Sequence, residues 1–211
     1  MPRQLSFLAA DVAPPSIDDV DGLLAGPAHT ARRADKARLS VLVGDEWRAE
    51  ALVAAFAELG IEADTAAAPR RHQDEAGEVD SLVVRTAFSA ALAGLAARWS
   101  AGAVKRPPPD WRLTGGRLRW WCLAAGAPDA GGFALRLAAG DEPSWPAIGA
   151  ALSAAALPAV LVGVRGGGPA YRVVGRRRVH RLAELVGDPP PGVPPEYWPA
   201  IQAPAVGRSR P

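Results

Sequence analysis

Arginines on predicted strands are the residues of this sequence best suited to binding a partner. Four strand-like segments each place one arginine opposite their apolar residues, so these arginines point away from the expected core. A guanidinium group has a planar fork of N–H donors that fits phosphate oxygens and guanine edges. We therefore predict a nucleic-acid-binding sheet face; the alternative is a solvated face in an arginine-rich protein. The four residues are Arg38, Arg85, Arg136 and Arg172.

Further cations extend this predicted surface. Arg165 lies at the tip of a predicted hairpin, and Lys105 and Arg106 lie in a predicted linker. Three more arginines open the last predicted helix, where the positive end of the helix dipole disfavours cations and a bound phosphate would relieve the repulsion. The alternative for this run is a solvated charge cluster. Its members are Arg176, Arg177 and Arg178.

The sequence shows no residue pattern for metal binding, disulfide formation, a phosphate-binding loop or catalysis. His29, His72 and His180 lack metal-ligand spacing, and the single Cys122 excludes a disulfide or a thiolate cluster within one chain. The glycines after Arg165 do not form a phosphate-binding loop pattern. No Ser/His/Asp set or paired carboxylates stand out. We predict no catalytic residue, no metal site and no cofactor.

Composition sets the broad class of protein. The 211 residues are 49% hydrophobic with seven tryptophans, which excludes a fully disordered chain. The sequence lacks both a signal-peptide pattern and an apolar run of about 18 residues, so we expect a soluble, cytoplasmic protein without membrane contact. Residues 1–100 carry a net charge of −5 and residues 101–211 carry +7. This asymmetry is typical of nucleic-acid binding, although a G/C-rich genome also enriches arginine.

Alternating helix and strand patterns must position these side chains. The first half predicts a helix, a strand, a helix, two strands and a helix, and the second half repeats that order. A further strand within 27–36 is left open. The predicted segments are 16–26, 37–43, 45–60, 61–66, 81–86 and 87–102, then 117–126, 133–138, 145–157, 158–164, 170–175 and 176–187.

Related residues in the two halves indicate an internal duplication. Leu23–Gly26 matches Leu123–Gly126 at an offset of 100, and Arg85 matches Arg172 at an offset of 87. We predict an α/β (α+β) fold of two pseudo-symmetric αββαββα repeats, with the strand arginines at related places in both. The predicted divisions are an N-terminal segment at 1–15, repeat 1 at 16–102, a linker at 103–116, repeat 2 at 117–187 and a Pro-rich tail at 188–211.

The order of elements within each repeat, with a first helix ending in Ala25-Gly26 or Ala125-Gly126, resembles half of a LAGLIDADG homing endonuclease. It is closer to the degenerate form of that fold in the N-terminal domain of the sporulation regulator WhiA. The resemblance spans about residues 18–187 and implies two sheets that form a saddle for duplex DNA. It also implies that the Ala-Gly pairs let the two signature helices approach closely.

The resemblance does not imply DNA cleavage. In the nucleases an acidic residue precedes each terminal glycine and holds a divalent metal, whereas Ala25 and Ala125 stand at those positions here. The WhiA pattern also includes a helix-turn-helix module, which the Pro-rich tail replaces. We therefore predict a non-catalytic protein that binds duplex DNA, mainly through its backbone and shape, or regulates transcription. The alternative is a protein-interaction scaffold that acts through the saddle or the tail.

Overall fold

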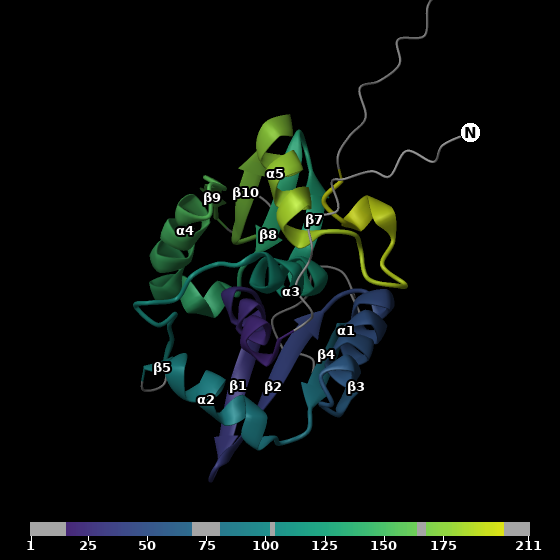
Figure 1. Ribbon diagram of the computed structural model, residues 1–211, viewed down its shortest axis with the longest axis vertical. Coiled ribbons are helices and arrows are strands. Elements are labelled where there is room, and N and C mark those ends of the chain that lie inside the picture. Colours follow the sequence, from purple (N-terminus) through teal and green to yellow (C-terminus); the bar gives the residue numbers. More distant parts are fainter. Residues whose placement is uncertain (1–15, 69–80, 102–103, 164–167, 201–211) are drawn as a thin grey trace, which may run out of the picture.

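A computed structural model describes residues 16–68, 81–101, 104–163 and 168–200 (Figure 1). In the first repeat the elements are η1 (Ile17–Ala25), β1 (Ala28–Arg33), β2 (Lys36–Val43), α1 (Glu46–Glu58), β3 (Ala63–Ala67), β4 (Leu82–Thr86), η2 (Ala90–Leu92) and α2 (Ala93–Arg98). A two-stranded ribbon follows, β5 (Ser100–Ala101) with β6 (Val104–Lys105). In the second repeat they are α3 (Gly115–Ala125), β7 (Gly126–Asp129), β8 (Gly132–Arg136), η3 (Ala139–Ser144), α4 (Trp145–Ala154), β9 (Val160–Val162), β10 (Ala170–Val174), α5 (Arg176–Val186) and η5 (Pro195–Tyr197).

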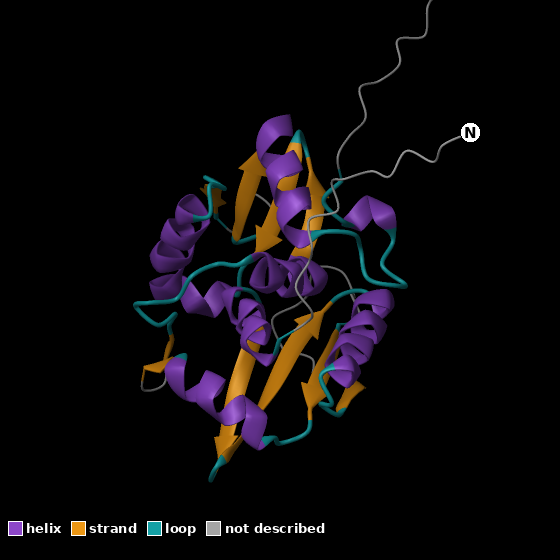
Figure 2. Cartoon of the chain, in the orientation of Figure 1, coloured by secondary structure: helices purple, strands orange, loops and turns teal. Residues whose placement is uncertain are grey.

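The two repeats form two antiparallel four-stranded sheets with the same topology. The first sheet has the strand order β1-β2-β4-β3, and the second has the equivalent order β7-β8-β10-β9. Figure 2 shows the sheets at opposite ends of the molecule, with η1 and α3 between them. The predicted α+β fold with two αββαββα repeats is confirmed.

Alternation of side chains gives each sheet a buried inner face. In β2, Leu39, Val41 and Val43 are buried between the more exposed Arg38, Ser40 and Leu42. In β8, Phe133 and Leu135 are buried in the same way. Helices α1 and α2 pack against the first sheet, and α3 and α5 pack against the second. The opposite face of each sheet, which we call its outer face, is free of these helices.

Two strands were harder to predict. The first strand of repeat 1, β1, occupies the segment that the sequence left open, because Ala28 is its single buried residue and no apolar alternation marks it. Its counterpart β7 was missed altogether, since its four residues include Gly126 and Pro128. Pro128 is tolerated because β7 lies at the edge of its sheet.

The helices η1 and α3 pack closely at the boundary between the repeats. A Cβ atom on Gly22 would overlap the carbonyl of Arg117, and one on Gly116 would overlap the Asp19 carboxylate. A Cβ on Gly26 would lie 2.9 Å from the Trp121 ring. The close approach that was expected of the Ala-Gly pairs is thus made mainly by Gly22 and Gly116, because these two glycines face the backbone or a short side chain of the other helix.

The start of the C-terminal tail packs against the body of the molecule, where Figure 1 shows it as an unlabelled yellow segment. Trp198 is buried and its indole N–H donates to the Gly187 carbonyl at 2.7 Å. The ring of Tyr197 lies 5.4 Å from that of Trp47 in α1. Residues 188–200 therefore contact both repeats, and residues 201–211 lie outside the described ranges.

Candidate nucleic-acid interface

All four predicted strand arginines lie on outer faces. Arg136 is exposed, and Arg38, Arg85 and Arg172 are partly exposed, each between buried neighbours that point inward. Arg38 and Arg85 belong to the first sheet, and Arg136 and Arg172 to the second. The predicted direction of these side chains is therefore correct.

The strand register determines which positions of the two sheets are equivalent. Arg85 pairs with Ser40 of β2, and Arg172 pairs with Ala134 of β8, so these two arginines are structural equivalents. Ser40 and Ala134 are therefore equivalent as well. Two residues further along these strands, Arg136 is equivalent to Leu42, and two residues back, Arg38 is equivalent to Gly132. The expectation that Arg38 and Arg136 occupy related places is wrong, because the strand positions are fixed by cross-strand pairing, which the sequence spacing did not reveal.

The arginines also differ in their contacts. Arg172 forms an ion pair with Asp129 across the second sheet, and the Arg38 guanidinium lies 5.0 Å from the centre of the Phe88 ring. Arg85 and Arg136 form no ion pair with any residue in the described ranges. An ion pair therefore partly neutralises the positive charge of the second outer face at Arg172, whereas Arg85 has no such partner in the described ranges.

The β1–β2 hairpin supplies cations that were not predicted. Arg33 pairs with Lys36 next to a two-residue turn at Ala34 and Asp35, and Ala34 has a φ of 54°. Both cations share the outer face with Arg38, since residues two apart on a strand point the same way. The alternating Arg and Lys residues flanking the Ala-Asp pair were a usable signal, but they lay in the segment left open.

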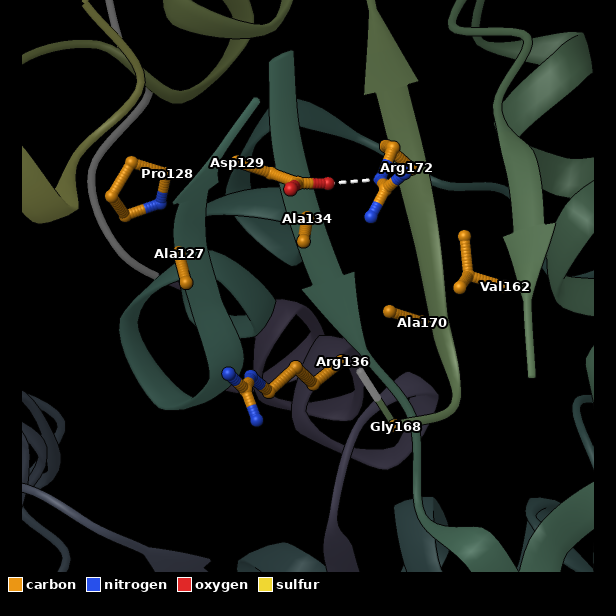
Figure 3. Close-up of a pocket in the computed structure, with 9 residues that line it drawn as sticks. All are labelled: Ala127, Pro128, Asp129, Ala134, Arg136, Val162, Gly168, Ala170 and Arg172. Carbon is orange, nitrogen blue, oxygen red and sulfur yellow. Dashed lines mark ion pairs between the residues drawn. The ribbon is translucent and has the colours of Figure 1, made fainter. Parts of the chain in front are cut away.

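A shallow hollow of about 220 Å³ lies on the second outer face (Figure 3). Arg136 borders it at one end and the Arg172–Asp129 ion pair at the other, and small side chains such as Ala134 and Ala170 form its floor. A floor of methyl groups lets another molecule approach the sheet closely. It offers few hydrogen-bonding groups apart from the two arginines and Asp129.

The remaining predicted cations have different outcomes. Arg176, Arg177 and Arg178 are exposed in the first turn of α5, and Arg178 donates to the Val174 carbonyl at 3.3 Å. Arg165 lies outside the described ranges. The prediction that Lys105 extends the cationic surface is wrong, because its Nζ is buried, 2.6 Å from Asp141.

Lys105 instead binds the C-terminal end of the first signature helix, which is η1. Its Nζ donates to the carbonyls of Gly26 at 2.8 Å and Ala28 at 2.9 Å. Burial lowers the pKa of this amine, and Asp141 opposes that shift. Helix carbonyls carry a partial negative charge that a cation stabilises, so Lys105 has a structural role here.

Arg48 of α1 does the same for the second signature helix. Its guanidinium donates to the carbonyls of Leu123 at 2.8 Å, Gly126 at 2.5 Å and Cys122 at 3.3 Å. Asp45 pairs with its Nε at 2.8 Å. Burial lowers the pKa of Arg48, and Asp45 opposes that shift. A buried arginine from one repeat thus closes the helix of the other.

These helix ends do not fit the divalent metal that the nucleases hold at the acidic residue of each signature helix. Ala25 and Ala125 are buried and have no side-chain oxygen. The nearby carbonyls of Gly26 and Gly126 already bind cationic side chains, which would repel a metal ion. Within the described ranges, no group of three or more His, Cys, Asp or Glu side chains is placed to hold a metal ion.

Asp21, the last acidic residue of the first signature helix, also has partners within the protein. Asp21 is 1% exposed and pairs with Arg117 of α3 at 2.6 Å, while the Trp99 indole N–H donates to it at 3.4 Å. Burial raises the pKa of Asp21, and contacts with Trp111, Arg117 and Trp99 oppose this. Asp21 therefore joins the two repeats and does not face solvent.

No protein-family model matches the chain, and no curated protein matches it in sequence. Solved structures do match its fold. One is the homing endonuclease I-WcaI bound to its DNA recognition sequence. The aligned region covers 80% of this chain and 78% of the I-WcaI chain, with a TM-score of 0.59 and 15% identity. I-DmoI in complex with DNA and Mn covers 82% and 99%, with a lower TM-score of 0.44 and 10% identity.

The match with I-WcaI shows that the chain has a LAGLIDADG-like fold. At this level of identity the likeness establishes the fold alone, so function has to be argued from the residues of this chain. None of the helices in the described ranges is long and apolar enough to cross a membrane.

Proposed function

We propose that this protein binds duplex DNA through the outer faces of its two sheets and does not cleave it. The observation that carries the proposal is the placement of Arg38, Arg85, Arg136 and Arg172 on those faces. A fold of this kind binds DNA in the I-WcaI complex, which supports the same use of the saddle here.

The balance of charge on the outer faces supports DNA as the partner. By register, the first face carries Arg33, Lys36, Arg38 and Arg85 against Asp64 among the described strands. The second carries Arg136 and Arg172 against Asp129. A surface with this excess of cations gains affinity by displacing the counterions that surround DNA phosphates.

Two features support a non-catalytic role. Alanine replaces the metal-binding acid at the end of each signature helix, and Lys105 and Arg48 occupy the carbonyls beside these alanines. A protein that binds DNA without cutting it suits the regulation of transcription, the role that the WhiA resemblance implies. We propose regulation as the biological use of the binding.

The test of DNA binding is fluorescence polarisation with a labelled random duplex of about 30 base pairs over a salt series. We expect affinity to fall steeply with salt. The triple variant Arg38→Glu, Arg85→Glu and Arg136→Glu should lose most binding and reduce the slope of log affinity against log salt by about 3. Unchanged affinity in this variant overturns the proposal.

The matched control changes the same charge on other parts of the surface. Arg98→Glu, Arg112→Glu and Arg181→Glu alter exposed arginines that lie off both sheets. This variant should retain far more affinity than the sheet variant. Incubation of the wild-type protein with plasmid and Mg²⁺ or Mn²⁺ tests the second half of the proposal, since metal-dependent cleavage contradicts a non-catalytic role.

A further inference from the structure

We infer that the first repeat alone reads base sequence, through one row of four polar side chains that crosses its sheet. This inference rests on the proposed DNA binding. The second repeat then adds affinity and shape complementarity without a base preference of its own. The row consists of His29, Ser40, Arg85 and Asp64.

Cross-strand pairing puts these four residues in a line. His29 of β1 is directly opposite Ser40 of β2, Ser40 is opposite Arg85 of β4, and Arg85 is opposite Asp64 of β3. Directly paired residues of antiparallel strands point to the same face. At about 4.8 Å between strands the row is about 14 Å long, close to the rise of four base pairs.

The residue types of this row match the hydrogen-bonding groups of bases. An arginine donates in pairs to guanine O6 and N7, and an aspartate accepts from the cytosine amino group. A serine hydroxyl both donates and accepts, and so discriminates less. Arg85 and Asp64 are neighbours in the row and form no ion pair with each other, so both side chains keep hydrogen-bonding groups for a partner.

The equivalent row of the second sheet lacks these groups. Its residues are Ala127, Ala134, Arg172 and Val160, in the same order across the strands. The single arginine is held by Asp129. Alanine and valine offer only methyl contacts, so this row together with its hollow fits a groove by shape and distinguishes few base pairs.

The inference is tested by selecting bound sequences from a random duplex library with the full chain. We expect a single motif of about four base pairs that is not repeated in an inverted second half. A motif in two halves, or binding without any preferred sequence, overturns the inference while the proposed DNA binding stands. No binding at all, even at low salt, is failure of the proposed function itself.

Variants then assign the motif to the row. Asp64→Ala should lower the ratio of specific to non-specific affinity about tenfold, with affinity for random DNA changed by less than about threefold. The control Thr65→Ala alters the neighbouring residue on the other face of β3 and should leave the ratio unchanged. An equal loss of specific and random binding in Asp64→Ala contradicts a reading role.

A transfer experiment gives a result that a merely structural role for the row cannot produce. The combined variant Ala127→His, Ala134→Ser, Val160→Asp and Asp129→Asn builds the first row's residue types into the second sheet and releases Arg172 from its ion pair. All four positions are on its outer face, so circular dichroism should match that of the wild type. We expect this variant to select a second half-motif, and a motif that stays single overturns the equivalence on which the inference depends.

Discussion

The two sheets share a strand order and a register but differ on their outer faces. Both bury an alternating apolar face, because each sheet needs a core beneath its helices. The outer row of the first sheet is polar at all four positions, and the corresponding row of the second is polar only at Arg172. The two repeats thus share the features that hold each half together, while their exposed surfaces differ.

The C-terminal ends of the two signature helices also share a physical feature that different residues provide. Both bind a buried cation, yet Lys105 comes from the β6 strand and Arg48 from α1. These residues are not equivalents under the repeat. The physical need for a positive charge at a buried helix end has been met twice, by unrelated positions of the chain.

The largest effect should come from breaking the interface that both repeats share. Gly22→Ala places a Cβ against the Arg117 backbone, and we expect the free energy of unfolding to fall by about 4 kcal/mol. Urea denaturation measures this change. Gly44→Ala is the control, since no atom lies within 4 Å of its Cβ position. Equal stability of the two variants would show that η1 and α3 can separate at little cost.

Removing the cations compares the two helix ends. Lys105→Met leaves Asp141 buried without its partner, and we expect a loss of about 3 kcal/mol in the free energy of unfolding. Adding Asp141→Leu should recover part of this loss, because no unpaired charge remains. Arg48→Met should cost a similar amount, because the three carbonyls that Arg48 binds lose its N–H donors. The exposed Arg98→Met serves as the control, and an Asp141→Leu change that worsens the loss would contradict the ion-pair argument.

Releasing Arg172 sharpens the contrast between the sheets. Asp129→Asn removes the ion pair on the second outer face, so we expect affinity for random duplex at low salt to rise about threefold. Asp110→Asn makes the same charge change in the linker and should have a smaller effect. If both variants bind equally well, net charge alone explains the gain and the state of Arg172 does not matter.

The smallest effect should be a pH dependence that only the first signature helix has, since Trp121 stands where the second would carry an equivalent of Asp21. Burial raises the pKa of Asp21, so the folded state holds this proton more tightly than the unfolded chain does. Its contribution to stability therefore falls as pH rises from below the ordinary value of 3.8 through the raised pKa.

Urea titrations of wild type and Asp21→Asn between about pH 3 and 7 measure this contribution. The stability of the wild type relative to the variant should decline as pH rises. A relative stability that increases over that range would show that the ion pair with Arg117 outweighs burial.

Much of the fold could be predicted because it has local signatures. Alternation marked β2 and β8, and the paired glycine-terminated helices marked the duplication. The strands β1 and β7 have little apolar content and were missed or left open.

For the candidate site, the sequence predicted the direction of the arginine side chains but not which positions of the two sheets are equivalent. The outward direction of Arg38 and Arg85 follows from alternation within one strand. The equivalence of residues in the two sheets does not, because it depends on how β2 pairs with β4 and how β8 pairs with β10. Lys105 was misassigned since its carbonyl partners lie 77 and 79 residues away, beyond any local pattern.

The bond from Arg48 to the end of α3 has a consequence for synthesis of the chain. The carbonyls that Arg48 binds lie 74 to 78 residues later. At about 5–20 residues per second, a ribosome takes about 4–15 s to add the residues between them. During that interval Arg48 has been synthesised, but the three carbonyls that it binds in the folded protein have not. The two repeats therefore form one folding unit, and separating them at the linker would leave Arg48 without the carbonyls that it binds.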